Sequence, residues 1–283
     1  MRLDSHQHFW RYSQEEYGWI PPGTPLERDW LPADLDRLQK PLGFDGSIAV
    51  QARQCLAESD WLLGLADGNP RVRGVVGWVD LRSESVGNDL ERLARHPRFV
   101  GVRHVVQDEP DDRFLLRPDF LRGVDRLREF GLTYDVLIYP RQLPAAIEFV
   151  GRFPEQPMVL DHIAKPFIKA GTLSPWREQI RELARFPHLL CKVSGMVTEA
   201  DPQNWKADDF RPYLETVFEA FGPSRLMFGS DWPVCRLAAT YEQVDGLVQD
   251  YVRGWSPESL AAFWGGNCAR FYGVTPPSSS GSR

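Results

Sequence analysis

Two histidines near the start of the chain, His6 and His8, are spaced for joint chemistry. They lie in the segment MRLDSHQHFW, and residues two positions apart on a β-strand share one face. Two imidazoles on one face can hold a divalent cation together or donate hydrogen bonds to one carbonyl oxygen. The pair alone is a weak sign, because polar residues near a chain start often simply face solvent.

A third imidazole and a carboxylate follow apolar, strand-like runs later in the chain. His162 stands in MVLDHIAKP and Asp231 stands in RLMFGSDWP. An acid that follows Gly-Ser and precedes Pro by two residues can also be a helix cap. Three imidazoles and one carboxylate form a donor set that suits a mononuclear zinc site, to which Glu199 is a candidate further ligand.

The elements that must position these side chains are short apolar runs, which alternate with longer segments of helical periodicity. The predicted strands are residues 2–8, 46–52, 72–79, 99–106, 133–139, 158–163, 189–194 and 225–231. Strand and helix in alternation, without hairpin signals, indicate parallel pairing. Eight such units in 283 residues predict a closed (β/α)8 barrel, or TIM barrel, with a doubly wound open sheet as the alternative.

Closure of the barrel would place the ends of strands one, six and eight around one point, at the end of the barrel where βα loops converge. We expect a single domain over residues 1–274. The last residues, 275–283, are rich in Pro and Ser and are expected to be a disordered tail.

A long segment after the first strand, residues 10–32, is rich in Pro and aromatic residues. Loops of this length without their own periodicity are usually functional or disordered. The aromatic content argues against disorder. We therefore expect this loop to form a wall of the pocket.

The composition excludes several classes of function. The net charge of −6 argues against nucleic acid and anionic membranes as partners. The four cysteines lie far apart without a CxxC pair, which excludes a zinc ribbon. No P-loop, dinucleotide fingerprint, signal peptide or long apolar span is present, so we expect a cytoplasmic enzyme without a nucleotide cofactor.

Five segments together resemble the amidohydrolase superfamily, and within it the sugar-lactonase branch. They are DSHQHFW, GVRH, LDHIAKP, CKVSGMVTEAD and LMFGSDWPVC. The resemblance covers nearly the whole chain. It implies a carboxylic-ester hydrolase that opens an aldonolactone, such as an L-fucono-, L-galactono- or D-arabinono-lactone, to the aldonic acid.

The chain departs from the superfamily members that hold two metals. Those usually place a bridging Lys or Glu on strand four and a His on strand five, whereas this chain offers Arg103 and His104, then Asp135 and Tyr139. A binuclear site is therefore not expected. The resemblance to the lactonase branch implies that no metal is required, with one zinc at His6 and His8 as the alternative.

For lactone hydrolysis we expect Asp231 to act as the general base for water. His6, His8 and His162 would form the electrophilic side, by donating to the carbonyl oxygen or by holding a cation that does. Lys192 and Ser194 lie two residues apart on a strand, where they rarely form an activated nucleophile. We expect instead that Lys192 tunes Asp231 by its charge.

Other polar and aromatic residues near the predicted strand ends are candidate sugar contacts. Each also has an ordinary packing or salt-bridge interpretation. The candidates are Trp30, Gln51, Trp78, Arg103, His104, Tyr139, Lys165, Glu199 and Trp232.

Two rival functions remain open. One is a metal-dependent decarboxylase or amidase of the same superfamily, and the other is a catalytically inactive, sugar-binding barrel. The expected partner is a small-molecule sugar lactone, and the expected assembly is a monomer or a homodimer.

Overall fold

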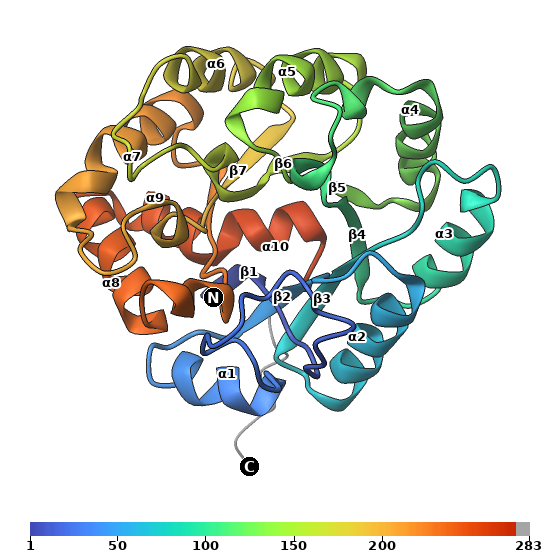
Figure 1. The fold of residues 1–283 in the computed structure, drawn as a ribbon, viewed down its shortest axis with the longest axis horizontal. Coiled ribbons are helices and arrows are strands. Elements are labelled where there is room, and N and C mark those ends of the chain that lie inside the picture. The colour runs from blue at the N-terminus through green and yellow to red at the C-terminus, as the bar shows by residue number, and fades with distance from the viewer. Residues whose placement is uncertain (276–283) are drawn as a thin grey trace.

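Eight parallel strands form one sheet that curls around a central axis, with the helices outside it (Figure 1). A computed structural model describes residues 1–275. Neighbouring strands pair in chain order from β1 to β8. The predicted (β/α)8 barrel is confirmed, and residues 276–283 of the expected tail lie outside the described residues.

The strands begin within one residue of their predicted starts, because apolar, β-branched runs buried on both faces mark them clearly. They are β1 Leu3–Gln7, β2 Gly46–Val50, β3 Val72–Gly77, β4 Phe99–His104, β5 Thr133–Val136, β6 Met158–Leu160, β7 Leu189–Val193 and β8 Leu226–Phe228. Every strand ends earlier than predicted. Consequently His8, Tyr139, His162 and Asp231 stand just beyond strand ends, in loops.

Helices follow each strand and cover the outside of the barrel with their apolar faces. They are α1 Pro32–Gln39, α2 Leu56–Gly68, α3 Val86–Ala94, α4 Pro118–Asp125, α5 Leu143–Arg152, α6 Trp176–Leu183, α7 Ala207–Phe221, α8 Tyr241–Val252, α9 Pro257–Ala261 and α10 Asn267–Tyr272. Within residues 1–275, no helix is long and apolar enough to cross a membrane.

The seam between β8 and β1 is closed by the residues that follow β8. Gln7 and Trp232 form a parallel bridge. The Asp231 amide donates to the His6 carbonyl at 2.9 Å, and the His8 amide donates to the Trp232 carbonyl at 2.7 Å. The open-sheet alternative is therefore wrong, and closure itself places Asp231 beside the two histidines.

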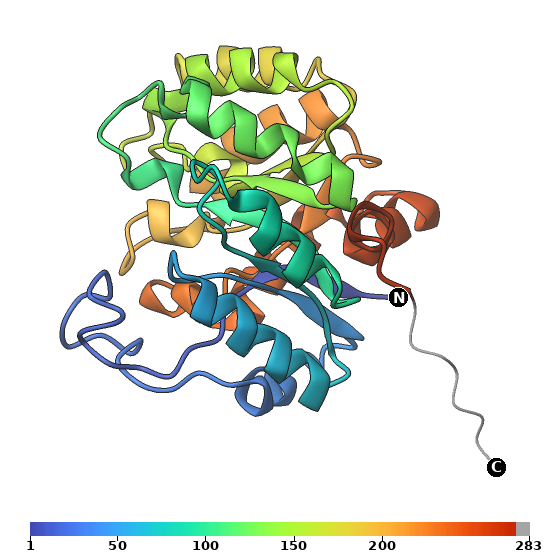
Figure 2. The same cartoon turned by 90° about the vertical axis from the view of Figure 1, so that its right-hand side faces the viewer.

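The amino-terminal end of the barrel is filled by apolar side chains and covered by α10. Leu3, Ile48, Val76 and Met227 form one buried cluster with Tyr272 of α10. Figure 2 shows α10, in red, on the right and the long blue loop on the left, at the opposite end of the barrel. This end is closed, so the interior is reached from the other one.

The long loop over residues 10–32 is ordered and packed. Trp10 and Trp30 form an antiparallel bridge, and Tyr17, Ile20 and Leu26 are buried. The Trp30 ring lies 5.2 Å from the Trp232 ring, centroid to centroid. The expected wall of the pocket is thus in contact with the residue next to Asp231.

An irregularity in β1 decides which of its side chains face inward. The pairing of β1 with β2 shifts between Asp4 and Gln7. Leu3 joins the interior cluster, and His6, three residues later, also points inward to contact Lys192. Strict alternation would place these two residues on opposite faces.

Candidate active site

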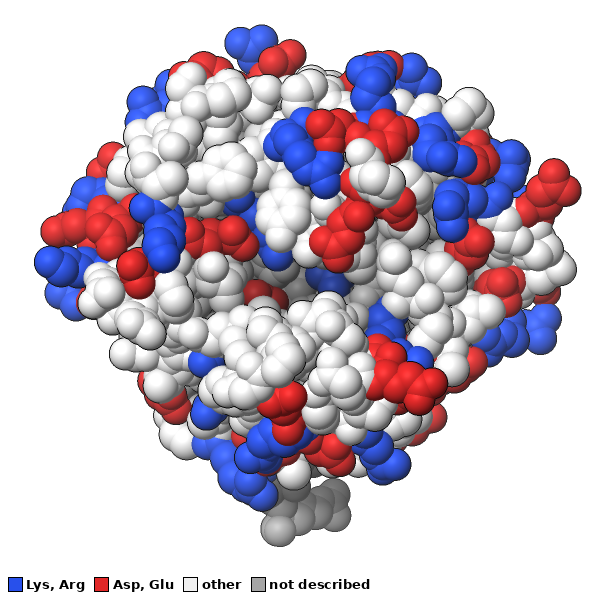
Figure 3. All heavy atoms as spheres, in the orientation of Figure 1, with Lys and Arg blue, Asp and Glu red and all other residues white. Residues whose placement is uncertain are grey.

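His6, His8 and Asp231 meet at the carboxyl end of the strands. The two imidazole Nε2 atoms lie 3.2 Å apart. Oδ1 of Asp231 lies 3.3 Å from Nε2 of His8 and 3.9 Å from Nε2 of His6. The three side chains are almost entirely buried, which strengthens every electrostatic contact among them. Figure 3 shows a hollow at the centre of this face, with acidic and basic atoms in its floor.

His162 completes this group, although it comes from a turn beyond β6. Its Nε2 lies 3.9 Å from Oδ1 of Asp231, and its ring centroid lies 4.3 Å from that of His6. Its Nδ1 lies 2.9 Å from the Ser194 hydroxyl, which follows β7. The four predicted residues are therefore gathered around one point; this group of His6, His8, His162 and Asp231 is called the mouth cluster below.

Two residues of the mouth cluster, His162 and Asp231, lie in loop segments with sparsely populated backbone conformations. Residues 162–165 all have positive φ, with values between 47° and 59°, and Asp231 has a φ of 57°. None of these residues is glycine, and each such conformation costs roughly 1–3 kcal/mol. Backbone strain of this kind is frequent at functional sites, where the surrounding structure maintains it.

Asp4, which sequence reasoning missed, fixes the turn that carries Asp231. Its carboxylate accepts hydrogen bonds from the Ser230 amide at 2.9 Å and the Ser230 hydroxyl at 2.6 Å. The Ser230 hydroxyl in turn accepts from the Trp232 amide at 3.0 Å. Asp231 is held on both sides by this arrangement. The available signal was an acid within the predicted first strand, two residues before His6.

A second layer of charged groups lies beneath the mouth cluster. The Lys192 ammonium lies 2.5 Å from Oδ2 of Asp135 and 3.0 Å from Oδ1 of Asp161. The Tyr272 hydroxyl of α10 donates to both oxygens of Asp135, at 2.9 and 3.0 Å. The prediction that Lys192 acts on Asp231 is therefore wrong. Within the described residues, Lys192 pairs with the carboxylates of Asp135 and Asp161 instead. Lys192, Asp135, Asp161 and Tyr272 are called the lower layer below.

Arg103 connects the two layers. Its Nη1 lies 3.3 Å from Nε2 of His6 and 3.2 Å from Oδ2 of Asp161. Its Nη2 donates to the Gln51 carbonyl at 2.5 Å. The guanidinium is thus fixed at the floor of the site, with one edge toward the mouth cluster.

The pKa shifts separate neutral imidazoles from ionised carboxylates. Burial lowers the pKa of His6 well below 6.5, and the Lys192 ammonium adds to this shift. Burial likewise lowers the pKa of His162 well below its usual value. Burial raises the pKa of Asp231, but His162, His8 and Lys165 outweigh it, so the net pKa is below 3.8. At neutral pH the cluster therefore combines an ionised carboxylate, Asp231, with two neutral imidazoles, His6 and His162.

A wall of partly buried polar residues lies near Asp231. Lys165 pairs with Glu199 at 3.8 Å and lies 5.4 Å from the Tyr139 ring centroid. Burial raises the pKa of Glu199; Lys165 opposes this shift and Asp231 adds to it. Three predicted sugar contacts are therefore neighbours on this wall.

Four predicted substrate contacts, three tryptophans and one glutamine, have buried polar atoms without a partner among the described residues. Trp78 directly follows the last residue of β3, Gly77. Within residues 1–275, Nε1 of Trp30, Trp78 and Trp232 and Oε1 of Gln51 are buried without a hydrogen-bond partner. Unpartnered buried donors and acceptors of this kind can bind the hydroxyl groups of a ligand.

His104 does not join the site. Its ring stacks on Phe114 at 4.9 Å, and its Nε2 lies 2.7 Å from Oε1 of Glu109. Arg103 faces the barrel interior, so the next residue of the strand faces the helices. The prediction that His104 contacts substrate is corrected here, and strand alternation alone could have excluded it.

Two groups of side chains within the described residues have the composition and spacing to hold a divalent metal ion. His6, His8 and Asp231 offer ligand atoms within 4.8 Å of one another, as do His6, Asp161 and His162. His8 has the usual support of a metal ligand, because its Nδ1 lies 2.8 Å from the Val50 carbonyl. His6 instead faces the Lys192 ammonium. Glu199, predicted as a further ligand, belongs to neither group in the part of the chain described.

Comparison with known proteins identifies the family of this chain. The amidohydrolase family model matches residues 3–274. The chain belongs to the amidohydrolase family.

This amidohydrolase is similar along nearly its full length to two proteins named as lactonases. It is 45% identical over 291 residues to the L-fucono-1,5-lactonase of Burkholderia multivorans, covering 98% of this chain and 97% of the relative. It is 38% identical to the L-fucono-1,5-lactonase of Burkholderia ambifaria, covering 98% and 97%. A crystal structure of a Burkholderia multivorans amidohydrolase with bound zinc is 44% identical, with a TM-score of 0.92 over 97% of this chain and 100% of that one.

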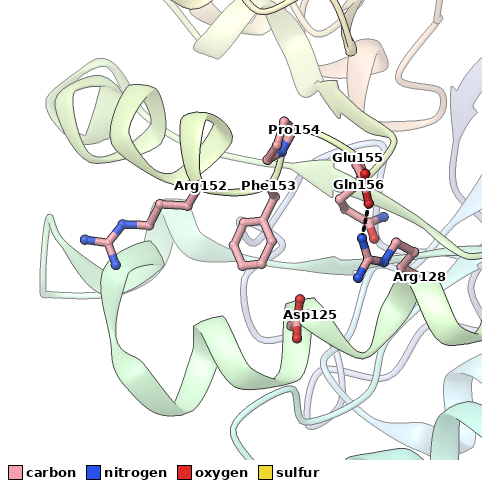
Figure 4. A pocket seen from close by; sticks show the side chains of 7 residues that line it. All are labelled: Asp125, Arg128, Arg152, Phe153, Pro154, Glu155 and Gln156. Carbon is pink, nitrogen blue, oxygen red and sulfur yellow. Dashed lines mark hydrogen bonds and ion pairs between the residues drawn. The ribbon is translucent and has the colours of Figure 1, made fainter.

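A second pocket of this amidohydrolase lies far from the mouth cluster. It has a volume of about 100 Å³ and is lined by Phe153, Pro154 and five polar or charged residues (Figure 4). These residues precede β5 and β6, at the amino-terminal ends of the strands. Enzymes with this fold carry their active sites at the carboxyl ends of the strands. This pocket, at the opposite end, is therefore not a candidate active site.

Proposed function

We propose that this amidohydrolase hydrolyses an aldonolactone, L-fucono-1,5-lactone or a close relative, to the aldonic acid. One observation carries the proposal: Oδ1 of Asp231 faces the Nε2 atoms of three imidazoles at distances of 3.3 to 3.9 Å. The names of the relatives, both L-fucono-1,5-lactonases, support the substrate class.

Asp231 is the proposed general base. Its carboxylate takes a proton from water as the water oxygen attacks the lactone carbonyl carbon. The carbon–oxygen bond of the ring then breaks, and Asp231 returns the proton to the departing ring oxygen. A lowered pKa keeps this carboxylate ionised and ready to accept the proton at neutral pH.

Arg103 and the imidazoles are the proposed stabilisers of the negative charge that develops on the carbonyl oxygen. The Arg103 guanidinium is held at 3.3 Å from His6 by its contacts to Asp161 and Gln51, so it needs no rearrangement during the reaction. Donors fixed in a water-poor site stabilise such charge far better than mobile donors in water.

The sugar hydroxyls are proposed to bind the polar wall and the unpartnered donors. Lys165 and Glu199 offer charged groups, and Tyr139 offers a half-buried phenol. Trp30, Trp78 and Trp232 offer indole N–H groups and apolar surface for the ring and its methyl substituent.

If a divalent metal is bound, His6, His8 and Asp231 would hold it, and it would polarise the lactone carbonyl. Metal-dependent decarboxylation or amide hydrolysis is less favoured, because the full-length curated relatives with an assigned activity are lactonases. An inactive sugar-binding barrel does not account for the ionised carboxylate among three imidazoles.

A pH-indicator assay tests the proposal. Purified protein is mixed in weak buffer with L-fucono-, L-galactono-, D-arabinono- and L-rhamnono-lactones, each with and without a chelator, against a protein-free blank. We expect acid release to be fastest with L-fucono-1,5-lactone or a close relative. Acid release no faster than the blank for every lactone, with and without added zinc, would contradict it.

The cellular setting is part of the same proposal. We infer a role in L-fucose catabolism from the names of the relatives, and we propose a cytoplasmic location and a monomeric or homodimeric state. Growth of a deletion strain on L-fucose, cell fractionation and light scattering of the purified protein test these three points.

A further inference from the structure

One buried carboxylate, that of Glu58, takes no part in the proposed reaction. Glu58 lies in the first turn of α2 and is 2% exposed. Its Oε2 accepts hydrogen bonds from the amides of Ala52, at 2.9 Å, and Arg53, at 2.7 Å. Its Oε1 accepts from the Tyr17 hydroxyl of the long loop, at 3.3 Å. Three donors from two other segments of the chain therefore fix this carboxylate.

The amide of Ala52 belongs to the same peptide group as the carbonyl of Gln51. This peptide group is trans and planar, so its N–H and C=O point in opposite directions. Glu58 accepts from the N–H, and Nη2 of Arg103 donates to the C=O at 2.5 Å. A single rigid group thus separates the Glu58 carboxylate from the Arg103 guanidinium. Rotation of this group would move its carbonyl oxygen away from Arg103.

The Arg103 guanidinium needs this carbonyl for its orientation. Within the described residues, two oxygen atoms accept hydrogen bonds from it: Oδ2 of Asp161, 3.2 Å from Nη1, and the Gln51 carbonyl oxygen. One acceptor alone would leave the planar guanidinium free to turn about that contact. Two acceptors on different nitrogens fix both its position and its plane. The Gln51 carbonyl supplies the second of these contacts.

We propose that Glu58 is a positioning residue that fixes the Gln51–Ala52 peptide and, through it, the Arg103 guanidinium at the floor of the site. The effect on the reaction rests on the proposed lactonase function, in which Arg103 stabilises the negative charge on the carbonyl oxygen. The contact between Glu58 and the peptide does not depend on that function.

This role needs the length of the Glu58 side chain rather than its charge. Burial raises the pKa of Glu58 to about 7, although the amides of Arg53 and Ala52 oppose the shift. The carboxyl group is therefore only partly ionised at neutral pH. The side-chain oxygen of a glutamine would reach the same two amides, whereas the carboxylate of an aspartate is one carbon shorter.

Glu58→Gln and Glu58→Asp separate length from charge. We expect kcat of Glu58→Gln to stay within about threefold of the wild type and kcat of Glu58→Asp to fall roughly 10- to 100-fold, because misplacing a group at the reacting centre by about 1 Å can cost that much. KM should change less, since Arg103 is proposed to act on the transition state. Lactone turnover is measured by pH indicator.

The matched control is Asp60→Asn, two residues further along α2. Asp60 is half-exposed and pairs with Arg92, away from the Gln51–Ala52 peptide, so this variant should keep the wild-type kcat. An unchanged kcat in a folded Glu58→Asp protein, or an equal loss of kcat in Glu58→Gln, would overturn the proposal.

A double-mutant cycle with Arg103→Ala shows whether Glu58 acts through Arg103. If it does, Glu58→Asp has little left to disturb once the guanidinium is gone, and kcat of the double variant should lie within about threefold of Arg103→Ala alone. A role of Glu58 in folding alone would lower kcat by the same factor in both backgrounds. That result would also overturn the proposal.

Amide exchange tests the contact with the peptide in the wild type, in case Glu58→Asp does not fold. The amides of Ala52 and Arg53 lie beyond the end of β2, and Glu58 accepts from both. We expect NMR to place them among the slowly exchanging amides. Exchange as fast as in an unstructured peptide would overturn the proposal. Absence of lactonase activity in the wild type would instead end the function proposal, while the exchange result still judges the contact of Glu58 with the peptide.

Discussion

The mouth cluster and the lower layer both gather buried ionisable side chains around a carboxylate, but they differ in how closely their charges are paired. In the lower layer, the Lys192 ammonium lies 2.5 and 3.0 Å from two carboxylates, and Tyr272 satisfies Asp135 further. In the mouth cluster, Oδ1 of Asp231 approaches three imidazoles no closer than 3.3 Å.

The difference indicates separate tasks. Charges buried in the barrel interior must be paired at short range, because desolvating them otherwise costs several kcal/mol each. The mouth cluster lies beside the opening, where a substrate or water can supply the missing partners. Short pairing distances thus characterise the layer that supports the site, and longer ones characterise the layer that we propose reacts with the substrate.

The largest expected effect comes from the base in the mouth cluster. Asp231→Asn keeps the shape but cannot take a proton from water, so kcat should fall by roughly 10²–10⁴-fold. The unfolding midpoint in urea should change little. Lactone turnover is measured by pH indicator with the wild type alongside. Near-normal turnover would show that another group is the base.

The lower layer should respond in stability. Asp135→Asn leaves the buried Lys192 ammonium with one carboxylate less, and breaking such a pair typically costs about 3–5 kcal/mol of unfolding free energy. Tyr272→Phe removes only a hydrogen bond and should cost about 1 kcal/mol. Urea denaturation followed by circular dichroism measures both. An Asp135→Asn protein as stable as the wild type would contradict the supporting role.

Two adjacent residues of β4 have side chains on opposite faces: Arg103 faces the barrel interior and His104 faces the helices outside it. Arg103→Ala removes a fixed donor from the floor of the site, so kcat/KM should fall by roughly 10- to 1000-fold. His104→Ala, its neighbour on the opposite face, should leave kcat/KM within about threefold, because its contacts are to Phe114 and Glu109. Equal losses for the two variants would refute this division, and an unchanged kcat/KM for Arg103→Ala would remove it from the site.

The smallest expected effect concerns the dependence of kcat/KM on pH, which we expect to be weak on the acidic side of neutrality. The active form needs ionised Asp231, which is present above its pKa and is lost as the pH falls through it. That pKa lies below 3.8, and those of His6 and His162 lie well below 6.5. We therefore expect protonation of Asp231 to cause no inflection in kcat/KM between pH 7 and about pH 5. An inflection between these values that disappears in Glu199→Gln would assign the base to Glu199, whose pKa is raised.

Much of this molecule follows from local sequence patterns. The alternation of short strand-like runs with helical segments located all eight strands, and parallel closure predicted that His6, His8, His162 and Asp231 would meet. Strand alternation, applied consistently, would also have moved His104 to the outside. These results depend only on period and residue type, which the sequence displays directly.

Other features depended on the folded barrel. The partners of Lys192 come from β5, β1 and the turn after β6, and the residue beneath them comes from α10. None of these partners lies near Lys192 in the sequence. The irregularity in β1 and the left-handed backbone at residues 162–165 and at Asp231 break the local rules. Sequence by itself determined which groups are available and roughly where they gather. Only the tertiary structure decided which charges are paired and which are left for a substrate, because pairing depends on distances of a few ångströms between strands remote in sequence.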